Sequence, residues 1–134
     1  MQYSLPIINA RLDVIETIIG PSPRLLIYTG AKPANCAAPA TGTLLNRMLL
    51  PVDYMIAASG GQKLKNGVWT GDAIAAGVQG YFRLLDTAEL VAHIQGTIGL
   101  ATDIPLPDLV VDELNVALNQ TMTFAGWSIT GGNA

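Results

Sequence analysis

Residues 90–100 alternate between apolar and polar side chains, and this alternation constrains the fold more than any other feature of the sequence. Successive side chains of a β-strand point to opposite faces, so a period of two indicates a strand with one face in a core. The even-numbered positions hold the side chains expected in that core: Leu90, Ala92, Ile94, Ile98 and Leu100. The odd-numbered positions face the other way: Val91, His93, Gln95 and Thr97. Gly96 and Gly99 leave room for a bend, a bulge or a close backbone approach.

Further short strands are predicted on both sides of this one. They cover residues 24–29, 43–50, 54–58, 63–69, 79–85, 109–111 and 121–129, and residues 114–118 are either a strand or one helical turn. The strand over 24–29 has apolar side chains on both faces, which predicts burial on both sides. Turns recur roughly every ten residues and strands do not alternate with helices, so a parallel α/β sheet is disfavoured. The pattern predicts a mainly β protein, an antiparallel β-sandwich or jelly roll.

One short helix is predicted near the N-terminus, over about residues 9–19. Asn9 is the expected N-cap, and Gly20 followed by Pro21 ends the helix. One face holds the apolar side chains Ile8, Leu12, Ile15 and Ile19, and the opposite side holds Asp13, Glu16 and Thr17. Residues 1–134 are expected to form a single β-sandwich domain, with strands from about 24 to 129. Residues 131–134 are expected to form a short flexible tail.

Charged side chains are scarce for a chain of this length. They make up 13% of the residues, whereas hydrophobic residues make up 50%, and soluble domains usually carry about 25% charged residues. Such a chain is suited to be one subunit of an assembly. The net charge of −3 and the seven scattered basic residues argue against a nucleic-acid partner. Apolar stretches are far shorter than the ~20 residues of a membrane-spanning helix, so no membrane partner is expected.

The residue types that catalysis and metal binding require are nearly absent. His93 and Cys36 are the single histidine and cysteine, and neither lies in a G-x-S-x-G or cysteine-protease signature. Four acidic residues lie close together in sequence without the spacing of an EF-hand loop: Asp103, Asp108, Asp112 and Glu113. Residues 59–63 lack the phosphate-loop pattern and predict a hairpin turn. We therefore expect no enzyme activity, no cofactor and no metal site.

Aromatic residues are the remaining candidates for recognition. In a small β domain they are more often core residues or anchors of a protein interface than a platform for sugars. Trp69 and Trp127 are the candidates for a carbohydrate platform, should they be exposed. As residues of a protein interface we predict His93, Gln95, Trp69 and Trp127. The N-terminal helix and any exposed strand edge are further candidate contact elements.

Several segments together resemble small virion proteins of tailed bacteriophages, and the resemblance covers nearly the whole chain. The segments are Leu12-Asp13-x-Ile15-Glu16-Thr17-x-Ile19-Gly20, Ser22-Pro23, Thr29-Gly30, Pro33-Ala34-Asn35-Cys36-Ala37-Ala38, Thr41-Gly42-Thr43, Ala58-Ser59-Gly60-Gly61-x-Lys63, Gly80-Tyr81-Phe82-Arg83, His93-Ile94-Gln95-Gly96-Thr97-x-Gly99 and Gly131-Gly132-Asn133-Ala134. Some proteins of this kind are cement or decoration proteins with a jelly-roll fold on the outside of the capsid.

The resemblance implies a structural protein of the virion, assembled in the host cytoplasm. Its expected partners are the major capsid protein or other virion proteins, together with further copies of itself as a dimer or trimer. A capsid decoration protein is the first hypothesis, and a neck, tail or baseplate adaptor is the alternative. A carbohydrate-binding adhesion module is the third hypothesis.

Overall fold

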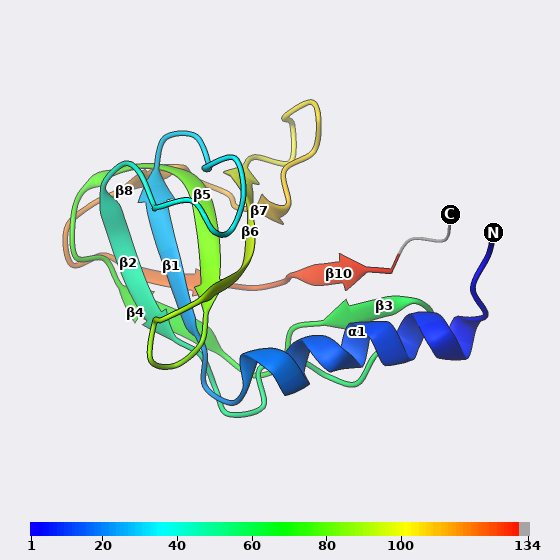
Figure 1. The fold of residues 1–134 in the computed structure, drawn as a ribbon. Coiled ribbons are helices and arrows are strands. Elements are labelled where there is room, and N and C mark those ends of the chain that lie inside the picture. Colours follow the sequence, from blue (N-terminus) through cyan, green and yellow to red (C-terminus); the bar gives the residue numbers. More distant parts are fainter. Residues whose placement is uncertain (132–134) are drawn as a thin grey trace.

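The computed structural model describes residues 1–131, which form one helix and a set of mostly short strands (Figure 1). The helix is α1 (Leu5–Ile19). The strands are β1 (Arg24–Thr29), β2 (Leu44–Leu49), β3 (Gln62–Leu64), β4 (Trp69–Asp72), β5 (Gly77–Leu85), β6 (Ala92–Gly99), β7 (Leu109–Val110), β8 (Asn115–Val116), β9 (Thr121–Phe124) and β10 (Ser128–Thr130). The prediction of a mainly β protein with one N-terminal helix is confirmed.

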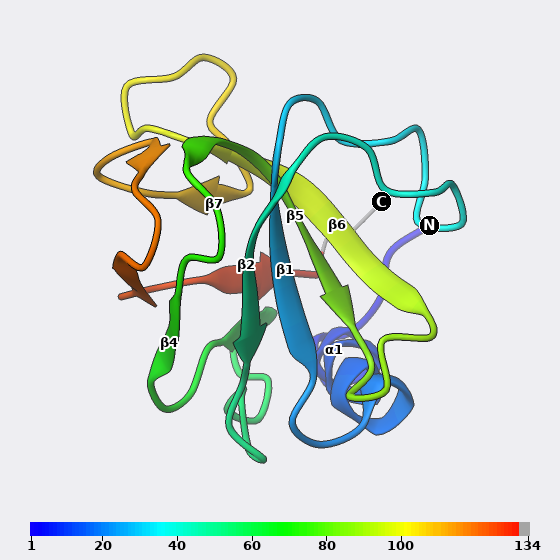
Figure 2. The ribbon, with the colours of Figure 1, turned by 90° about the vertical axis from the view of Figure 1, so that its left-hand side faces the viewer.

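The largest sheet has the strand order β2-β1-β5-β6-β7, and β8 pairs with the start of β5. Figure 2 shows β2, β1, β5 and β6 side by side. The pairs in this sheet are antiparallel except for β6 and β7, which are parallel. Two further antiparallel pairs, β4–β9 and β10–β3, complete the described strands. The predicted antiparallel pairing is therefore confirmed for most of the chain.

The core lies between one face of the large sheet and the β4–β9 pair. Leu25 and Ile27 of β1 and Leu84 of β5 meet Trp69 of β4 and Phe124 of β9 in a single buried cluster. These strands are short, so each contributes only a few apolar side chains. Stability therefore depends on packing the two layers together, since a two-stranded pair alone is marginal in water.

The opposite face of the large sheet is covered by the loop of residues 30–43. The Tyr81 hydroxyl donates to the Thr41 carbonyl over 2.6 Å, and Arg83 Nη2 donates to the Ala38 carbonyl over 2.7 Å. Gln95 Nε2 donates to the Pro33 carbonyl over 2.8 Å. These three side chains donate to loop carbonyls that have no partner in a strand, and these hydrogen bonds hold the loop on the sheet. In β1, Leu25 and Ile27 on one face and Leu26 on the other are buried, which confirms the predicted burial of this strand on both faces.

The helix begins at Leu5, four residues before the predicted N-cap. Pro6 lies in its first turn, where a missing N–H group costs nothing. Asn9 is therefore inside the helix, and its side-chain oxygen accepts a hydrogen bond from the Gly61 backbone N–H over 2.9 Å. The predicted apolar face is correct: Ile8, Leu12 and Ile19 are buried. α1 lies along β3 beside the β10–β3 pair, which extends away from the large sheet (Figure 1).

Three predicted strands differ from the structure. Residues 54–58 form only an isolated bridge between Met55 and Lys65, because both Tyr54 and Met55 turn into the core. The strand predicted over 63–69 is interrupted, because β3 ends at Leu64 and β4 begins only at Trp69, and these two strands have different partners. The strand predicted over 121–129 is likewise divided into β9 and β10. Residues 115–116 are a strand, which decides the alternative left open for 114–118. Most of the predicted tail, residues 132–134, lies outside the described residues.

Strand β6 has the predicted register in its middle but not at its start. Ile98 is buried and Ile94 packs against the core. A Cβ atom at Gly96 would lie 2.7 Å from the Phe82 ring, so this glycine permits a close approach of the strand to that ring. Leu90 was predicted in the core but is 81% exposed. It lies in the turn between β5 and β6, where the strand alternation does not yet apply.

We predict that Leu84→Ala destabilises the protein by about 2–5 kcal/mol, because Leu84 is fully buried and its removal leaves a cavity. Val78→Ala is the matched control on the same strand, since Val78 is half exposed. It should change the free energy of unfolding by less than about 1 kcal/mol. Urea unfolding followed by tryptophan fluorescence measures both. Equal losses in the free energy of unfolding would contradict the burial of Leu84 and the exposure of Val78.

Candidate interaction surface

The two tryptophans predicted at an interface belong to the core and its margin. Trp69 is 1% exposed, and its indole N–H donates to the Asn66 carbonyl over 3.1 Å. Trp127 is half-buried between two aromatic rings, with centroids 5.5 Å from Trp69 and 5.6 Å from Phe82. Trp69 is thus unavailable to a partner, and the prediction that it lies at an interface is corrected. The same burial removes it from any sugar-stacking platform.

His93 and Gln95 lie on β6 but have different surroundings. His93 is half-buried and lines a hollow of about 250 Å³ with Ile15, Ile18 and Ile94, between α1 and β6. Gln95 is committed to the 30–43 loop through its hydrogen bond to Pro33. His93 therefore remains a candidate contact residue beside the helix, whereas Gln95 has an internal structural role. Cys36 lies in the same loop and is partly exposed.

The outer side of α1 is an exposed apolar stripe, which we call the α1 outer face: Ile7, Ala10, Val14 and Ile18. Their spacing places them on one side of the helix, away from the buried Ile8, Leu12 and Ile19. Ile18 is 63% exposed, and Ile7 and Val14 are each about half exposed. A surface helix normally has a polar outer side, so a second apolar stripe indicates a contact surface. Ile18 joins this stripe to the hollow beside His93.

A buried ion cluster fixes the other side of α1. The Lys63 side chain is 0% exposed, and its Nζ lies 2.7 Å from Asp13 Oδ1 and 2.6 Å from Glu16 Oε2. It also donates to the Ile56 carbonyl over 3.0 Å. Burial alone would lower the pKa of the Lys63 amine, but its bonds to Asp13 and Glu16 outweigh burial and leave the pKa raised. Asp13 and Glu16 were predicted to lie away from the packed side of the helix; instead they flank it and bind Lys63. Their i, i+3 spacing signals a shared side, but no local pattern identifies Lys63 as their partner.

Three of the acidic residues of 103–113 accept hydrogen bonds from backbone N–H groups. Asp103 Oδ2 accepts from the Leu100 N–H over 2.8 Å, and Asp108 Oδ2 accepts from the Thr97 N–H over 2.9 Å. Glu113 Oε1 accepts from the Asn115 N–H over 2.8 Å. Within residues 1–131, no three His, Cys, Asp or Glu side chains converge as a metal site requires. No helix among the described residues is both long and apolar enough to cross a membrane.

Comparisons of the chain with known protein families, with curated proteins and with solved structures give no match.

We predict that Lys63→Met destabilises the protein less than the double change Asp13→Asn with Glu16→Gln. The double change leaves the Lys63 ammonium buried without a charged partner, which costs about 3–5 kcal/mol. Lys63→Met leaves two carboxylates that are partly exposed and that water can reach. The triple variant should recover much of the lost stability, because an apolar side chain then fills an uncharged site. Urea unfolding of the four proteins tests the order, and a triple variant no better than the double would contradict it.

Acid should weaken the attachment of α1. Hydrogen bonds from Lys63 and from the Ala58 N–H hold the pKa of the Asp13 carboxyl below its usual value of 3.8. A carboxyl with a lowered folded-state pKa stabilises the fold above its unfolded-state pKa, and the contribution is lost as pH falls through the folded-state value. Wild-type protein should therefore lose stability below about pH 4, and Asp13→Asn should lose less over the same range. Urea midpoints measured from about pH 7 to about pH 2.5 test this. If the urea midpoint falls equally with pH in wild type and in Asp13→Asn, the prediction is refuted.

Proposed function

We propose that this chain is a non-enzymatic structural subunit of a bacteriophage particle, and that it decorates and reinforces the head. The observation that carries the proposal is the α1 outer face, an exposed apolar surface on a chain with few charges. Covering such a surface has a low desolvation cost, because few charged groups must leave water. The bacteriophage particle and the major capsid protein as partner come from the sequence resemblance.

Reinforcement follows from simple mechanics once the subunit bridges two capsid proteins. A shell under internal pressure fails at the seams between its subunits. A domain that buries surface on both sides of a seam adds its binding energy to the work needed to open that seam. Interfaces of useful strength bury on the order of 1,200–2,000 Å². The α1 outer face is one part of such a surface, and its extension toward His93 enlarges the apolar area.

We also propose that the layers form a β-sandwich. Packing of the β4–β9 pair against the large sheet supports this, because one core cluster contains side chains from both layers. The jelly-roll connection of the strands rests on the sequence resemblance. A carbohydrate platform has less support, because one of its two proposed rings, Trp69, is buried.

The decisive experiment adds purified protein to capsids that lack it and measures binding and rupture temperature. Val14→Asp places a charge in the centre of the α1 outer face, and Val52→Asp makes the same change at another exposed position. We expect Val14→Asp to bind about tenfold more weakly or worse, whereas Val52→Asp binds as wild type. Circular dichroism must show that both variants are folded. Wild-type protein that neither binds capsids nor raises their rupture temperature would refute the decoration role.

The copy number per virion separates the head from the neck, tail or baseplate. A head decoration protein is present in hundreds of copies, whereas an adaptor on the tail axis follows its closed rotational symmetry and is present in about six to twelve. Comparing the amount of this chain with that of the major capsid protein in intact particles measures this. Light scattering of the free protein shows whether it is already a dimer or trimer before it binds.

A further inference from the structure

Strand β9 has one edge without a strand partner among residues 1–131. It pairs with β4 through Thr121↔Asp72 to Phe124↔Trp69, and these two strands form a sheet of two. An unpaired edge presents a row of backbone N–H and C=O groups that can bind another extended chain. Most edges of this kind are blocked by charge, proline or a covering loop, so the surroundings of this edge decide whether it is accessible.

The hydrogen bonds of β4 and β9 show which main-chain groups are free. The Gln120 carbonyl accepts from the Ala73 N–H over 2.8 Å, and the Met122 carbonyl accepts from the Thr70 hydroxyl over 3.1 Å. Gln120 and Met122 therefore direct their main-chain groups toward β4. Successive residues of a strand direct these groups to opposite edges. It follows that the N–H and C=O groups of Thr121 and Thr123 point to the edge away from β4.

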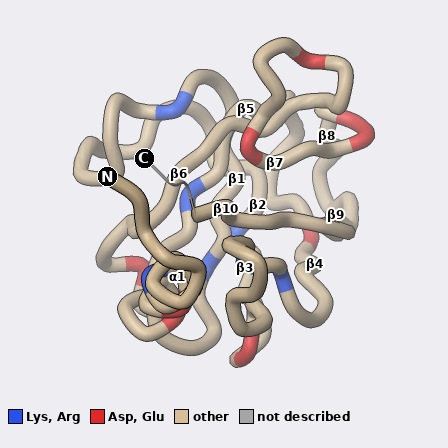
Figure 3. Tube along the Cα trace, turned by 90° about the vertical axis from the view of Figure 1, so that its right-hand side faces the viewer, with Lys and Arg blue, Asp and Glu red and all other residues tan. Residues whose placement is uncertain are grey.

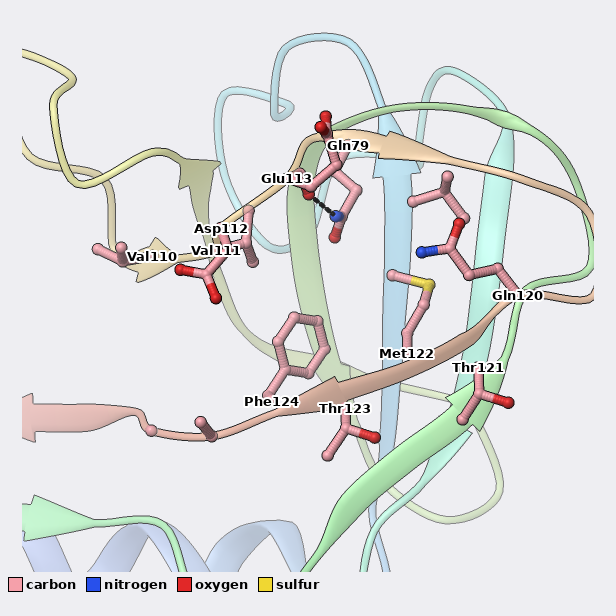
Figure 4. A pocket seen from close by; sticks show the side chains of 13 residues that line it. Gln79, Val110, Val111, Asp112, Glu113, Gln120, Thr121, Met122, Thr123 and Phe124 are labelled. Atoms are coloured by element: carbon pink, nitrogen blue, oxygen red, sulfur yellow. Dashed lines mark hydrogen bonds between the residues drawn. The ribbon is translucent and has the colours of Figure 1, made fainter.

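That edge borders a pocket of about 280 Å³, whose other wall is the segment Val110–Glu113 (Figure 4). Figure 4 shows β4 below β9 and the pocket above it. Thr123 lines the pocket although its hydroxyl lies 3.0 Å from that of Thr70, on the other face of the pair. Its contribution to the pocket is therefore its main chain. The pocket thus gives access to the free N–H and C=O groups of β9.

A β-bulge directs an amide side chain into this pocket. In the β1–β5 ladder Tyr81 pairs with Tyr28 and Gln79 with Thr29, so Gly80 is the extra residue. A Cβ atom at position 80 would collide with the Gly30 carbonyl, which explains the glycine. Without the bulge, Gln79 would share a face with Tyr81, beneath the loop. With it, Gln79 turns to the core side and lines the pocket. Bulges commonly redirect a side chain in this way beside functional sites.

The orientation of the Gln79 amide is fixed, and its oxygen is free. Nε2 donates to the Glu113 carbonyl over 3.0 Å, and a carbonyl can only accept, so the nitrogen must face that atom. Gln79 is 6% exposed, and its Oε1 accepts no hydrogen bond from the described chain. Figure 4 shows the amide pointing into the pocket above Met122. A buried acceptor of this kind is costly unless a donor reaches it.

The charges at the pocket are negative. Asp112 and Glu113 lie on its rim, and no Lys or Arg lines it. Figure 3 shows only acidic positions around β7 and β8. Two hydrogen bonds from Asn115, through its backbone and its side chain, hold the pKa of the Glu113 carboxyl below its usual value, so this group is charged at neutral pH. The rim therefore favours a cationic group.

We propose that the free edge of β9 binds an extended segment of a partner protein that carries a Lys or Arg side chain. The segment adds to β9 as a third strand through the main chain of Thr121 and Thr123. One of its N–H groups donates to Gln79 Oε1, and its basic side chain lies against Asp112. Main-chain hydrogen bonds supply affinity in strand addition, and the side chains supply selection.

The test uses a short synthetic peptide and nitrogen-15-labelled protein. The probe is acetyl-Thr-Val-Lys-Val-Thr-amide, and the comparison peptides replace its Lys by Glu or carry N-methyl groups on the backbone. We expect the probe to shift the amide resonances of Thr121 and Thr123. Both comparison peptides should bind about tenfold more weakly than the probe. The Glu peptide lacks the basic side chain that pairs with Asp112, and the N-methyl peptide lacks backbone N–H donors. No shifts up to millimolar probe, or shifts confined to another part of the chain, would overturn the proposal.

Protein variants separate the main chain from the side chains. Thr123→Pro removes the free N–H, and proline is tolerated where that group is not used within a sheet. Thr123→Val keeps the N–H and removes the hydroxyl. Probe binding should be lost in the first and kept in the second. Asp112→Asn should weaken binding, whereas Asp53→Asn, the same change outside the pocket, should not. If Thr123→Pro does not fold, the N-methyl peptide decides alone, and its binding as tightly as the probe overturns the proposal.

This inference does not rest on the proposed function. The β9 edge and the α1 outer face share no residues. A chain that binds the probe but no capsid retains the strand-addition site and loses the decoration role. A chain that binds capsids through α1 but does not bind the probe retains the decoration role and loses the strand-addition site.

Discussion

The rest of the structure depends on the burial of strand β5 on both of its faces. Phe82 and Leu84 point into the cluster shared with β4 and β9, whereas Tyr81 and Arg83 point beneath the loop of residues 30–43. A strand in this position needs an apolar face on one side and hydrogen-bond partners for its polar side chains on the other, because buried polar groups without partners are costly. Arg83 Nη2 donates to the Asn35 and Ala38 carbonyls of the loop, so the loop and the sheet stabilise each other, although the buried Nε has no partner in the described chain.

The sequence predicts those parts of the fold in which burial has a simple period. The apolar face of α1, the strands over 24–29 and 79–85, and the middle of β6 are correct because one face of each packs against the core. The prediction is wrong where the chain changes its partner strand within an apolar run. Residues 121–129 are apolar and β-branched enough for one strand, yet pairing with β4 ends at Phe124 and pairing with β3 begins at Ser128. Pairing of this kind depends on distant residues.

The candidate sites were harder to predict than the fold, for a related reason. A tryptophan at an interface and a tryptophan in a core can have the same local sequence, so the sequence does not show that Trp69 is buried. Lys63 is buried because two carboxylates of another element reach it, and a periodic pattern cannot show that contact. The exposed apolar stripe of α1, in contrast, can be predicted from the sequence. Its helix is apolar on two sides, and only one of them fits against β3 and β10.

The Lys63 cluster and the α1 outer face are physically connected. A helix of this length is marginal alone and must be held by packing. Ile8, Leu12 and Ile19 supply that packing, and the bonds from Lys63 to Asp13 and Glu16 add a buried contact that depends on the rotation of the helix, as does the hydrogen bond from the Gly61 N–H to Asn9. Rotating α1 about its axis would bury the outer stripe, but it would also withdraw Asp13 and Glu16 from Lys63 and leave a buried charge unpaired. The ion cluster thus adds to the preference for burying the larger side chains Ile8, Leu12 and Ile19, and it helps to explain why the second apolar stripe stays exposed.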